Sequence, residues 1–533
     1  MAMNRNPSSL CHRSFDLLVC GGGIYGAWTA YDAALRGLKV ALIDQGDWGG
    51  ATSSASSKLV HGGLRYLEQF EFRLVRKTLT EREMLIKAAP HRVWPLRFGV
   101  PVYAHSRVGW LRMKLGLMLY DLLAAGQTSG RRHRFFSRYR FAERFPPLNT
   151  GTLKCGFTYA DAQTDDARLV LELVDGAIQA GAVCVNYCKL TRLIEENGQA
   201  CGAELVDLST NQSCAIRMRQ IVFATGRWQA ADQQIKNDCQ LTRGIHLILP
   251  PLLKDEALLL TAPSDGRVFF VIPWYGLTLL GTTDTSYHGS LDAIEIDRTE
   301  IAYLLDAANA YLKKSWSEAD IIGAFAGLRV LKYTSAAEAA AAPSSISRDW
   351  ELKTAANGAH YSIGGKLTSA RQDAAQIVDR VSTALNIQRP CATHGRLFPW
   401  YPHESGMDFP AWSQAMQEQA VQSGVDRESA FWLIRRHGGN VTEILRTIAH
   451  HPVLAERIVP SLPFITADLL YCAAHEMVVH LDDALRRRIP LLILAKLTAT
   501  DLRRIAGSIS GILHWDAARC AQEISRCQAW LKQ

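Results

Sequence analysis

Three glycines near the start of the chain have the spacing of a dinucleotide-binding turn. Gly21, Gly23 and Gly26 read G-x-G-x-x-G, a pattern that allows a tight turn, a close approach of the backbone to a pyrophosphate and close packing of a helix on a strand. An apolar segment precedes the turn, a small-residue segment follows it, and the next apolar segment ends at Asp44. A carboxylate about 20 residues beyond such a turn binds the ribose. These residues predict a Rossmann-type unit that binds NAD or FAD.

A second group of chemically capable side chains follows in residues 51–68, ATSSASSKLVHGGLRYLE. The segment is too rich in serine and glycine to be a core helix, yet it holds Lys58, His61, Arg65 and Tyr66 within nine positions. Arginine suits bidentate phosphate binding and lysine acts as a point charge. A histidine can take up a proton near neutral pH. Binding of an anion and transfer of a proton are therefore the chemistry to expect here.

The elements that would position these residues follow from periodicity. Residues 64–89 carry apolar side chains at helical spacing, Leu67 and Phe70 among them, with charges between, which predicts one long helix. Residues 182–225 alternate strand-like runs with polar turns and end in an ATG tripeptide. Residues 240–350 are rich in short β-type runs, which predicts a second sheet.

The two reactive segments together resemble the FAD-dependent glycerol-3-phosphate dehydrogenases, the membrane-associated respiratory type within the larger D-amino-acid-oxidase-like group of flavoproteins. Further blocks agree with that family in their order along the chain. They are DDARLVLELV at 165–174, FATGRW at 223–228, VIPWYGLTLLGTTD at 271–284, GLRVL at 327–331, SISRDWEL at 345–352 and GGKLTSARQDA at 364–374. The resemblance covers about residues 15–385 and continues more weakly beyond them.

The resemblance implies an α/β fold (α+β overall) with three parts: a Rossmann-type FAD-binding domain, a D-amino-acid-oxidase-like β-rich substrate domain and a C-terminal α-helical cap. The FAD-dependent oxidoreductase domain is expected at 15–388. Its FAD-binding parts are expected at about 15–100, 150–235 and 350–388, and its substrate-binding part at about 236–350. From 389 the chain turns to helical segments rich in Trp and Arg, which predicts the cap at 389–533.

The resemblance also implies a reaction. Members of the family oxidise sn-glycerol 3-phosphate to dihydroxyacetone phosphate by hydride transfer to FAD, and the electrons pass to membrane quinone. The chain shows one dinucleotide fingerprint and no second Rossmann unit, so we do not expect a nicotinamide acceptor. No Cys or His stands where covalent members of the wider group attach their flavin, which predicts non-covalent FAD.

Matching motifs imply roles for individual residues. Cofactor contacts are expected from Gly21, Gly23, Gly26, Asp44, Thr52, Ser53, Lys58, Gly226, Leu367 and Thr368. The substrate-binding set is Arg65, Tyr66, Thr283, Arg329 and Lys366. The catalytic set is His246, His61 and Arg348. Either histidine could be the general base, and the choice between them stays open.

Three positions depart from the family pattern. Val330 stands where a proline usually follows the arginine, and Phe223 and Arg227 replace the usual asparagine and proline around ATG. The predicted set of cations remains intact, but these departures are expected to reshape the pocket.

Length and composition limit the alternatives. A chain of 533 residues with 48% hydrophobic residues is expected to form two or three domains. No run reaches the roughly 18 apolar residues that a membrane-spanning helix needs, and the short polar N-terminus does not resemble a signal peptide. The twelve cysteines are scattered without a C-x-x-C pair, which predicts reduced thiols in a cytoplasmic protein and no metal site.

Most of the surplus positive charge lies in residues 105–140. The whole chain carries +8, and this segment holds eight Lys or Arg residues against one acid, Asp121. Apolar residues recur in it at helical spacing, with cations beside them: Trp110, Leu111, Leu115, Met118, Leu119 and Leu122. This pattern is typical of a helix that lies in a bilayer interface. It predicts peripheral attachment to an anionic membrane surface, namely that of the cytoplasmic membrane.

Two other functions remain open. An amine or amino-acid oxidase would share the fold, but it needs a carboxylate clamp and an apolar amine pocket in place of a phosphate-sized group of cations. A basic nucleic-acid-binding protein is the more remote alternative, suggested by an isoelectric point near 8.8 and by GRRHRFFSRYRF at 130–141. No nucleic-acid partner is expected, because one basic cluster in a flavoprotein framework is weak support. The oligomeric state, a homodimer included, is left undecided by the sequence.

Overall fold

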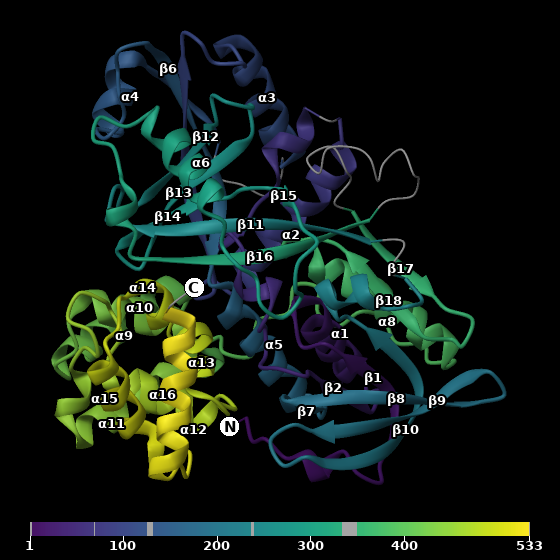
Figure 1. The fold of residues 1–533 in the computed structure, drawn as a ribbon. Helices are drawn as coiled ribbons and strands as arrows, with labels where there is room; N and C mark the ends of the chain where they lie inside the picture. Colours follow the sequence, from purple (N-terminus) through teal and green to yellow (C-terminus); the bar gives the residue numbers. More distant parts are fainter. Residues whose placement is uncertain (1–2, 69, 125–131, 236–238, 333–348, 532–533) are drawn as a thin grey trace.

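The computed structural model describes residues 3–68, 70–124, 132–235, 239–332 and 349–531. Two sheets and a group of C-terminal helices make up these parts (Figure 1). In this view the sheet that holds β1 and β2 lies at the lower right beside α1 and α8, the sheet that holds β11 and β16 lies above it, and the C-terminal helices lie at the lower left. The predicted fold class is therefore confirmed.

The first sheet contains the nucleotide-binding unit, in the strand order β17-β18-β10-β1-β2-β7. β1 (Ser14–Cys20) pairs in parallel with β2 (Val40–Ile43) and with β10 (Gln212–Phe223), and α1 (Ile24–Leu35) connects β1 to β2. Most side chains of α1 are buried, because α5 (Asp166–Gln179) and α8 (Ala370–Ala384) both pack against it. The other strands of this sheet are β7 (Val183–Val185), β8 (Cys188–Glu196), β9 (Gln199–Asp207), β17 (Trp350–Thr354) and β18 (His360–Gly364).

The second sheet is mostly antiparallel and has the order β15-β11-β14-β13-β12-β4-β6-β3, with β16 beside β11 and β5 beside β6. Its strands are β3 (Leu59–Val60), β4 (Val93–Tyr103), β5 (Arg134–Ser137), β6 (Leu153–Thr164), β11 (Cys239–Leu249), β12 (Glu256–Thr261), β13 (Val268–Trp274), β14 (Leu277–Gly281), β15 (Thr285–Ser286) and β16 (Gly323–Lys332). The sheet is wider than the expected substrate-binding segment at 236–350, because it also takes strands from earlier in the chain. Helix α6 (Arg298–Asn309) packs against β11.

Beyond residue 389 the described chain contains helices and turns. The helices are α9 (Phe409–Gln422), α10 (Arg427–His437), α11 (Val441–His450), α12 (Thr466–His475), α13 (Leu481–Asp483), the π-turn η11 (Ala484–Arg488), α14 (Leu491–Leu494), α15 (Ala499–Ser510) and α16 (Ala517–Leu531). The helical character expected of the cap is present, while the domain boundary at residue 388 stays a prediction.

One helix begins later than its sequence pattern indicates. A short 3-10 turn, η3 (Leu64–Leu67), precedes α2 (Phe72–Ala88), so residues 64–89 do not form the single helix expected. Phe70 has a left-handed φ of 59° and is 76% exposed, whereas the apolar stripe would have buried it. Helix α3 (Trp110–Leu123) packs against both η3 and α2, at the end of the molecule away from the C-terminal helices (Figure 1).

A buried network of charges joins the C-terminal helices to α5. The Arg168 guanidinium pairs with the Glu476 carboxylate and donates a hydrogen bond of 2.8 Å to the carbonyl oxygen of Arg436. Arg436 in turn pairs with Asp468. All four side chains are at most 2% exposed. Each buried charge is therefore matched, as burial of ions in a protein interior requires.

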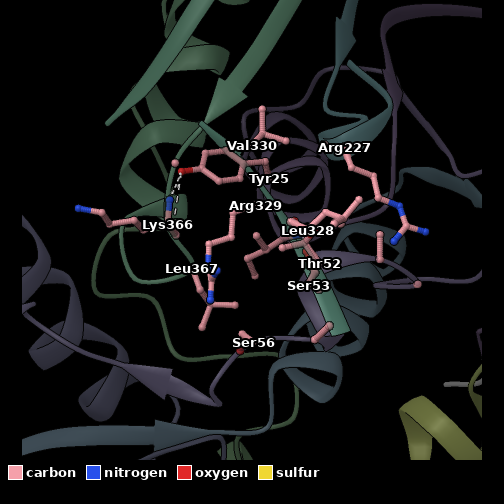
Figure 2. Close-up of a pocket in the computed structure, with 18 of the residues that line it drawn as sticks. Tyr25, Thr52, Ser53, Ser56, Arg227, Leu328, Arg329, Val330, Lys366 and Leu367 are labelled. Carbon is pink, nitrogen blue, oxygen red and sulfur yellow. Dashed lines mark hydrogen bonds between the residues drawn. The ribbon is translucent and has the colours of Figure 1, made fainter. Parts of the chain in front are cut away.

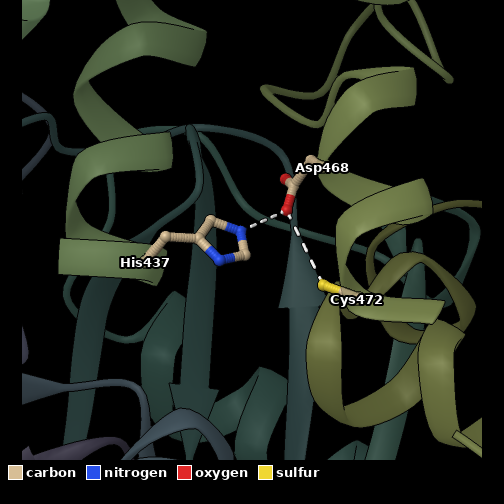
Figure 3. A group of neighbouring side chains, drawn as sticks. All are labelled: His437, Asp468 and Cys472. Atoms are coloured by element: carbon tan, nitrogen blue, oxygen red, sulfur yellow. Dashed lines mark hydrogen bonds and ion pairs between the residues drawn. The ribbon is translucent and has the colours of Figure 1, made fainter. Parts of the chain in front are cut away.

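His437, Asp468 and Cys472 meet inside this network with a spacing that could hold a metal ion (Figure 3). The Asp468 carboxylate already accepts a hydrogen bond from the Arg436 guanidinium and lies 2.6 Å from Nε2 of His437. Nη1 of Arg168 lies 3.9 Å from the Cys472 sulfur. Two guanidinium cations at the edge of the group oppose a further cation, so we interpret the cluster as part of the interhelical network.

Candidate FAD and substrate site

One large cavity of about 1030 Å³ is lined by residues of both sheets. It opens at the carboxyl ends of β1, β2 and β10, the edge where parallel α/β sheets bind their ligands, and it continues to β11, β13 and β16. Most predicted site residues line it: Gly21, Gly23, Asp44, Thr52, Ser53, His61, Tyr66, Gly226, His246, Thr283, Arg329, Lys366, Leu367 and Thr368. Figure 2 shows part of this lining, with Lys366 and Arg227 on opposite sides.

Four predicted residues are not part of that described lining. Gly26 lies one helical turn into α1 and contacts β1, because a Cβ there would stand 1.8 Å from the Gly21 carbonyl oxygen. Lys58 is buried behind the lining. Arg348 lies outside the described residues, and so does the side chain of Arg65.

The glycine-rich turn has the geometry that a pyrophosphate site needs. Gly21 adopts a φ of +106°, and a Cβ on it would stand 2.5 Å from the Ala224 carbonyl oxygen. Gly23 precedes α1 directly, and the amide of Ile24 donates to the Ser53 hydroxyl oxygen at 2.9 Å. The helix N-terminus, with its partial positive charge, therefore faces the cavity.

Asp44 lies at the end of β2, as the sequence predicts. Its carboxylate accepts hydrogen bonds from the amides of Gly22 at 2.6 Å and Gly46 at 2.7 Å. Burial raises the pKa of Asp44 to about 6 although these two amides act in the opposite direction. The carboxylate is thus fixed beside the turn, where a ribose hydroxyl could donate to it.

The serine-rich segment after the turn is anchored from behind by an ion pair. The Lys58 ammonium lies 2.6 Å from Asp166 and donates to the Ser54 carbonyl oxygen at 2.7 Å. The Ser56 hydroxyl donates to the same carboxylate at 2.6 Å. Because Lys58 is only 2% exposed, it shapes the loop that carries Thr52 and Ser53. Its predicted direct contact with the cofactor stays a prediction.

Lys366 follows two glycines that β18 delivers to the cavity. Its backbone amide donates to the Tyr25 hydroxyl at 3.0 Å (Figure 2), and that hydroxyl donates to Asp373 at 2.7 Å. The Lys366 ammonium lies 3.7 Å from the centre of the Tyr66 ring. Tyr25 was missed by the sequence reasoning, although it stands inside GGGIYG. Nothing in the local pattern indicates a partner that follows it by 341 residues.

Arg329 reaches the cavity from β16. Its guanidinium donates to the carbonyl oxygen of Thr283 at 3.1 Å and to the hydroxyl of Thr282 at 3.0 Å, and it lies 3.3 Å from the Asp284 carboxylate. The Thr283 hydroxyl donates a hydrogen bond of 2.8 Å to Glu300, so its proton already has an acceptor within the protein. These contacts hold the guanidinium in one orientation at the cavity wall.

His246 and His61 stand at the same cavity in different surroundings. His246 is 1% exposed, stacks on Phe325 and has its Nε2 atom 2.8 Å from the Ser57 hydroxyl oxygen. Burial, aided by the positive charge of Arg329, holds the pKa of His246 well below its usual value of 6.5. The imidazole is therefore neutral at physiological pH. The backbone amide of His61 donates to the Thr368 hydroxyl at 3.1 Å.

The chain matches known families along most of its length. Residues 16–371 match the model of FAD dependent oxidoreductases, and residues 405–520 match the C-terminal domain of alpha-glycerophosphate oxidase. A glycerol-3-phosphate dehydrogenase from Synechocystis sp. is 33% identical over 99% of this chain and 98% of its own length. The chain belongs to the FAD-dependent glycerol-3-phosphate dehydrogenase family. An aerobic glycerol-3-phosphate dehydrogenase from Staphylococcus aureus is 33% identical over 90% of this chain and 87% of its own.

Structural similarity agrees with this membership. The X-ray structure of a glycerol-3-phosphate dehydrogenase from Bacillus halodurans complexed with FAD has a TM-score of 0.79 and 26% identity, covering 98% of this chain and 96% of that one. The predicted family, enzyme class and FAD cofactor are confirmed, and the amine-oxidase and nucleic-acid alternatives fit less well. The Gly21 turn and the Asp44 carboxylate are suited to the ADP half of this cofactor.

Proposed function

We propose that this protein oxidises sn-glycerol 3-phosphate to dihydroxyacetone phosphate and passes the electrons to a membrane quinone. The observation that carries the proposal is the meeting of Arg329, Lys366 and a neutral His246 at one cavity, in a chain whose relatives are named for this substrate. When bound, FAD supplies the acceptor for the hydride that leaves the carbinol carbon.

The substrate phosphate is assigned to the cations. Arg329 offers a guanidinium held at the cavity wall, and Lys366 offers an ammonium above the Tyr66 ring. A dianionic phosphate gains from both, since Arg binds it through a bidentate fork and Lys through a point charge. Arg65, next to Tyr66 in the sequence, belongs to the same proposed set, as Arg348 does on the carbinol side.

The carbinol proton is assigned to His246. A base must be unprotonated to act, and the lowered pKa of His246 meets this condition at neutral pH. Its Nε2 atom contacts the Ser57 hydroxyl, and both residues line the cavity. We infer that Ser57 keeps the imidazole oriented toward the substrate. His61 is the second candidate.

Comparing two substrates tests the phosphate requirement. With a soluble dye as electron acceptor, sn-glycerol 3-phosphate should be turned over and glycerol should be a very poor substrate, because glycerol leaves the cations without their anion. Steady-state kcat/KM for both compounds is the measurement. Equal values for the two would exclude the proposed function.

Membrane attachment is proposed through α3 and the basic residues that follow it. No helix in the described parts of the chain is long and apolar enough to span a bilayer. α3 buries Leu117 and Tyr120 against the protein but leaves a second apolar face exposed by 49% to 68%: Trp110, Leu111, Leu115, Met118 and Leu122. A patch of this kind on a surface helix marks a contact site. Exposed Arg132, Arg134 and Arg140 supply charge for an anionic surface.

Charge reversal should release the protein from membranes. Arg132→Glu, Arg134→Glu and Arg140→Glu combined should weaken binding to vesicles of anionic lipid, because each cation near such a surface contributes about 1 kcal/mol. The matched control reverses Arg192, Arg217 and Arg219, which are exposed on the first sheet. Vesicle sedimentation measures binding, and dye-linked activity should stay near that of the parent. Equal retention of both triple variants on vesicles would show that this face is not the anchor.

A further inference from the structure

Arg227 is a cation of the cavity to which the proposed mechanism gives no role. It follows Gly226 in the 3-10 turn η4 (Gly226–Ala231), directly after β10 ends. Its side chain lines the cavity on the side opposite Lys366, with Thr52 and Ser53 beneath it (Figure 2). The family resemblance leads us to expect proline at this position, and this chain has arginine there.

The Arg227 guanidinium is buried without an ion pair. The residue is 8% exposed, and its Nε atom has no hydrogen-bond partner among the described residues. Within those residues no carboxylate lies within 4.0 Å of it. The guanidinium stacks on the Trp228 ring at 4.5 Å. Burial lowers the pKa of Arg227, although the charges of Asp292, Tyr287 and Asp44 act in the opposite direction.

The two carboxylates whose charges act on Arg227, those of Asp292 and Asp44, accept hydrogen bonds from other groups. Asp292 accepts a hydrogen bond from the Trp228 indole at 2.9 Å, and Asp44 accepts hydrogen bonds from the backbone amides of Gly22 and Gly46. A buried and unpaired cation is costly. It persists most readily where an anion occupies the adjoining space when the protein works.

The position identifies the anion. Ala224, three residues before Arg227, packs its carbonyl against Gly21 of the pyrophosphate turn. Arg227 therefore lies on the side of the cavity formed by Gly21 and Asp44. Lys366 and Leu367 lie across the cavity (Figure 2). FAD carries its two negative charges on the pyrophosphate, which joins its adenosine to its riboflavin.

We propose that Arg227 binds the ADP half of FAD and donates charge-assisted hydrogen bonds to its phosphate oxygens. Arginine is suited to this role because its rigid fork matches phosphate oxygens and because it remains protonated when buried. In this chain the residue adds a side-chain cation to a phosphate site that is otherwise formed by backbone amides and a helix N-terminus.

The test compares three ligands on the full-length holoenzyme. FAD affinity is measured from the recovery of free-flavin fluorescence on dilution, and affinities for ADP and adenosine from their displacement of FAD. Arg227→Gln should weaken both FAD and ADP by about 10- to 100-fold, as loss of a charge-assisted bond does, and should leave adenosine unchanged. Arg219→Gln, an exposed arginine on β10, is the control and should match the parent.

Two further variants separate charge from volume. Arg227→Lys should retain more affinity for FAD and ADP than Arg227→Gln, and Arg227→Met should lose as much as Arg227→Gln. Equal weakening of FAD, ADP and adenosine would mean a distorted pocket and would overturn the proposal. So would parent-like ADP affinity in Arg227→Met. None of these measurements requires turnover. The Arg227 proposal can therefore be wrong while the proposed substrate is correct, and it can be correct while the proposed substrate is wrong.

Discussion

Two groups of arginines in this molecule differ in their protein partners. At the junction of α5 with the C-terminal helices, Arg168 pairs with Glu476 and Arg436 with Asp468. At the cavity, Arg227 has no carboxylate partner among the described residues, and Arg329 contacts hydroxyl and carbonyl oxygens with one carboxylate at 3.3 Å. In the first group each guanidinium lies against a buried carboxylate, although Nε and Nη1 of Arg436 have no hydrogen-bond partner among the described residues. In the second group Arg227 lies beside the cavity with no carboxylate of the described residues paired with it.

Arg168 and Arg227 illustrate the difference between a structural cation and a binding cation. Burial alone does not separate them, since Arg168 and Arg227 are both nearly inaccessible. They differ in whether a carboxylate of the protein pairs with the guanidinium. A cation paired with a buried carboxylate holds the fold together, whereas a buried cation without such a pair, beside a cavity, favours an incoming anion.

Breaking the Arg168–Glu476 pair should have the largest effect on stability. Arg168→Met leaves Glu476 buried without its main partner, which should lower the free energy of unfolding by about 3 to 5 kcal/mol. Arg457→Ala, which removes the exposed pairs with Asp426 and Glu428, should cost only about 0 to 1 kcal/mol. Urea unfolding of the holoenzyme measures both.

The double variant Arg168→Met with Glu476→Gln sharpens this prediction. It removes both charges and should recover part of the lost stability, because the penalty comes from the unpaired carboxylate. A loss for Arg168→Met no larger than for Arg457→Ala would contradict the structural role of the junction.

Replacing a cavity cation should act on catalysis instead of stability. Arg329→Ala or Lys366→Ala should each lower kcat/KM for sn-glycerol 3-phosphate about 10- to 100-fold, since a charge-assisted bond contributes roughly 1.5–3 kcal/mol. The unfolding free energy should change less than in Arg168→Met. Variants that unfold as readily as Arg168→Met but retain full kcat/KM would contradict the assignment of these two cations to substrate binding.

The pH profile of kcat/KM tests the assignment of the base. Since burial holds the pKa of His246 well below 6.5, the base stays unprotonated as pH falls through 6.5, and kcat/KM should decline only at lower pH. His246→Gln should lower kcat and remove this acidic limb. A limb in the parent centred at 6.5 or above would exclude His246 as the base.

Local patterns predicted the parts of the site that are local in sequence. The turn at Gly21, its helix and Asp44 lie in one strand–helix–strand unit, so their spacing indicates their geometry. Lys58 shows the limit, because its partner Asp166 is far along the chain and only the fold reveals that the ammonium is already paired. The prediction for Phe70 is wrong for a related reason. Helical periodicity does not reveal that η3 stops at Leu67 and that α2 begins only at Phe72.

The C-terminal junction was the least predictable part. Arg168 stands in a motif shared with the family, yet its sequence neighbours give no sign of Glu476, which lies 308 residues away. Such pairs arise from tertiary packing, and no spacing rule reports them. Arg227 was visible in the sequence only as a departure, and its burial beside the cavity gave the departure a physical meaning.

The most direct test of the proposed function is the visible spectrum of the yellow holoenzyme under anaerobic conditions. We predict that sn-glycerol 3-phosphate bleaches the flavin absorbance and yields dihydroxyacetone phosphate in an amount equal to the FAD reduced, whereas glycerol leaves the spectrum unchanged. A flavin that remains oxidised in excess sn-glycerol 3-phosphate would contradict the assignment.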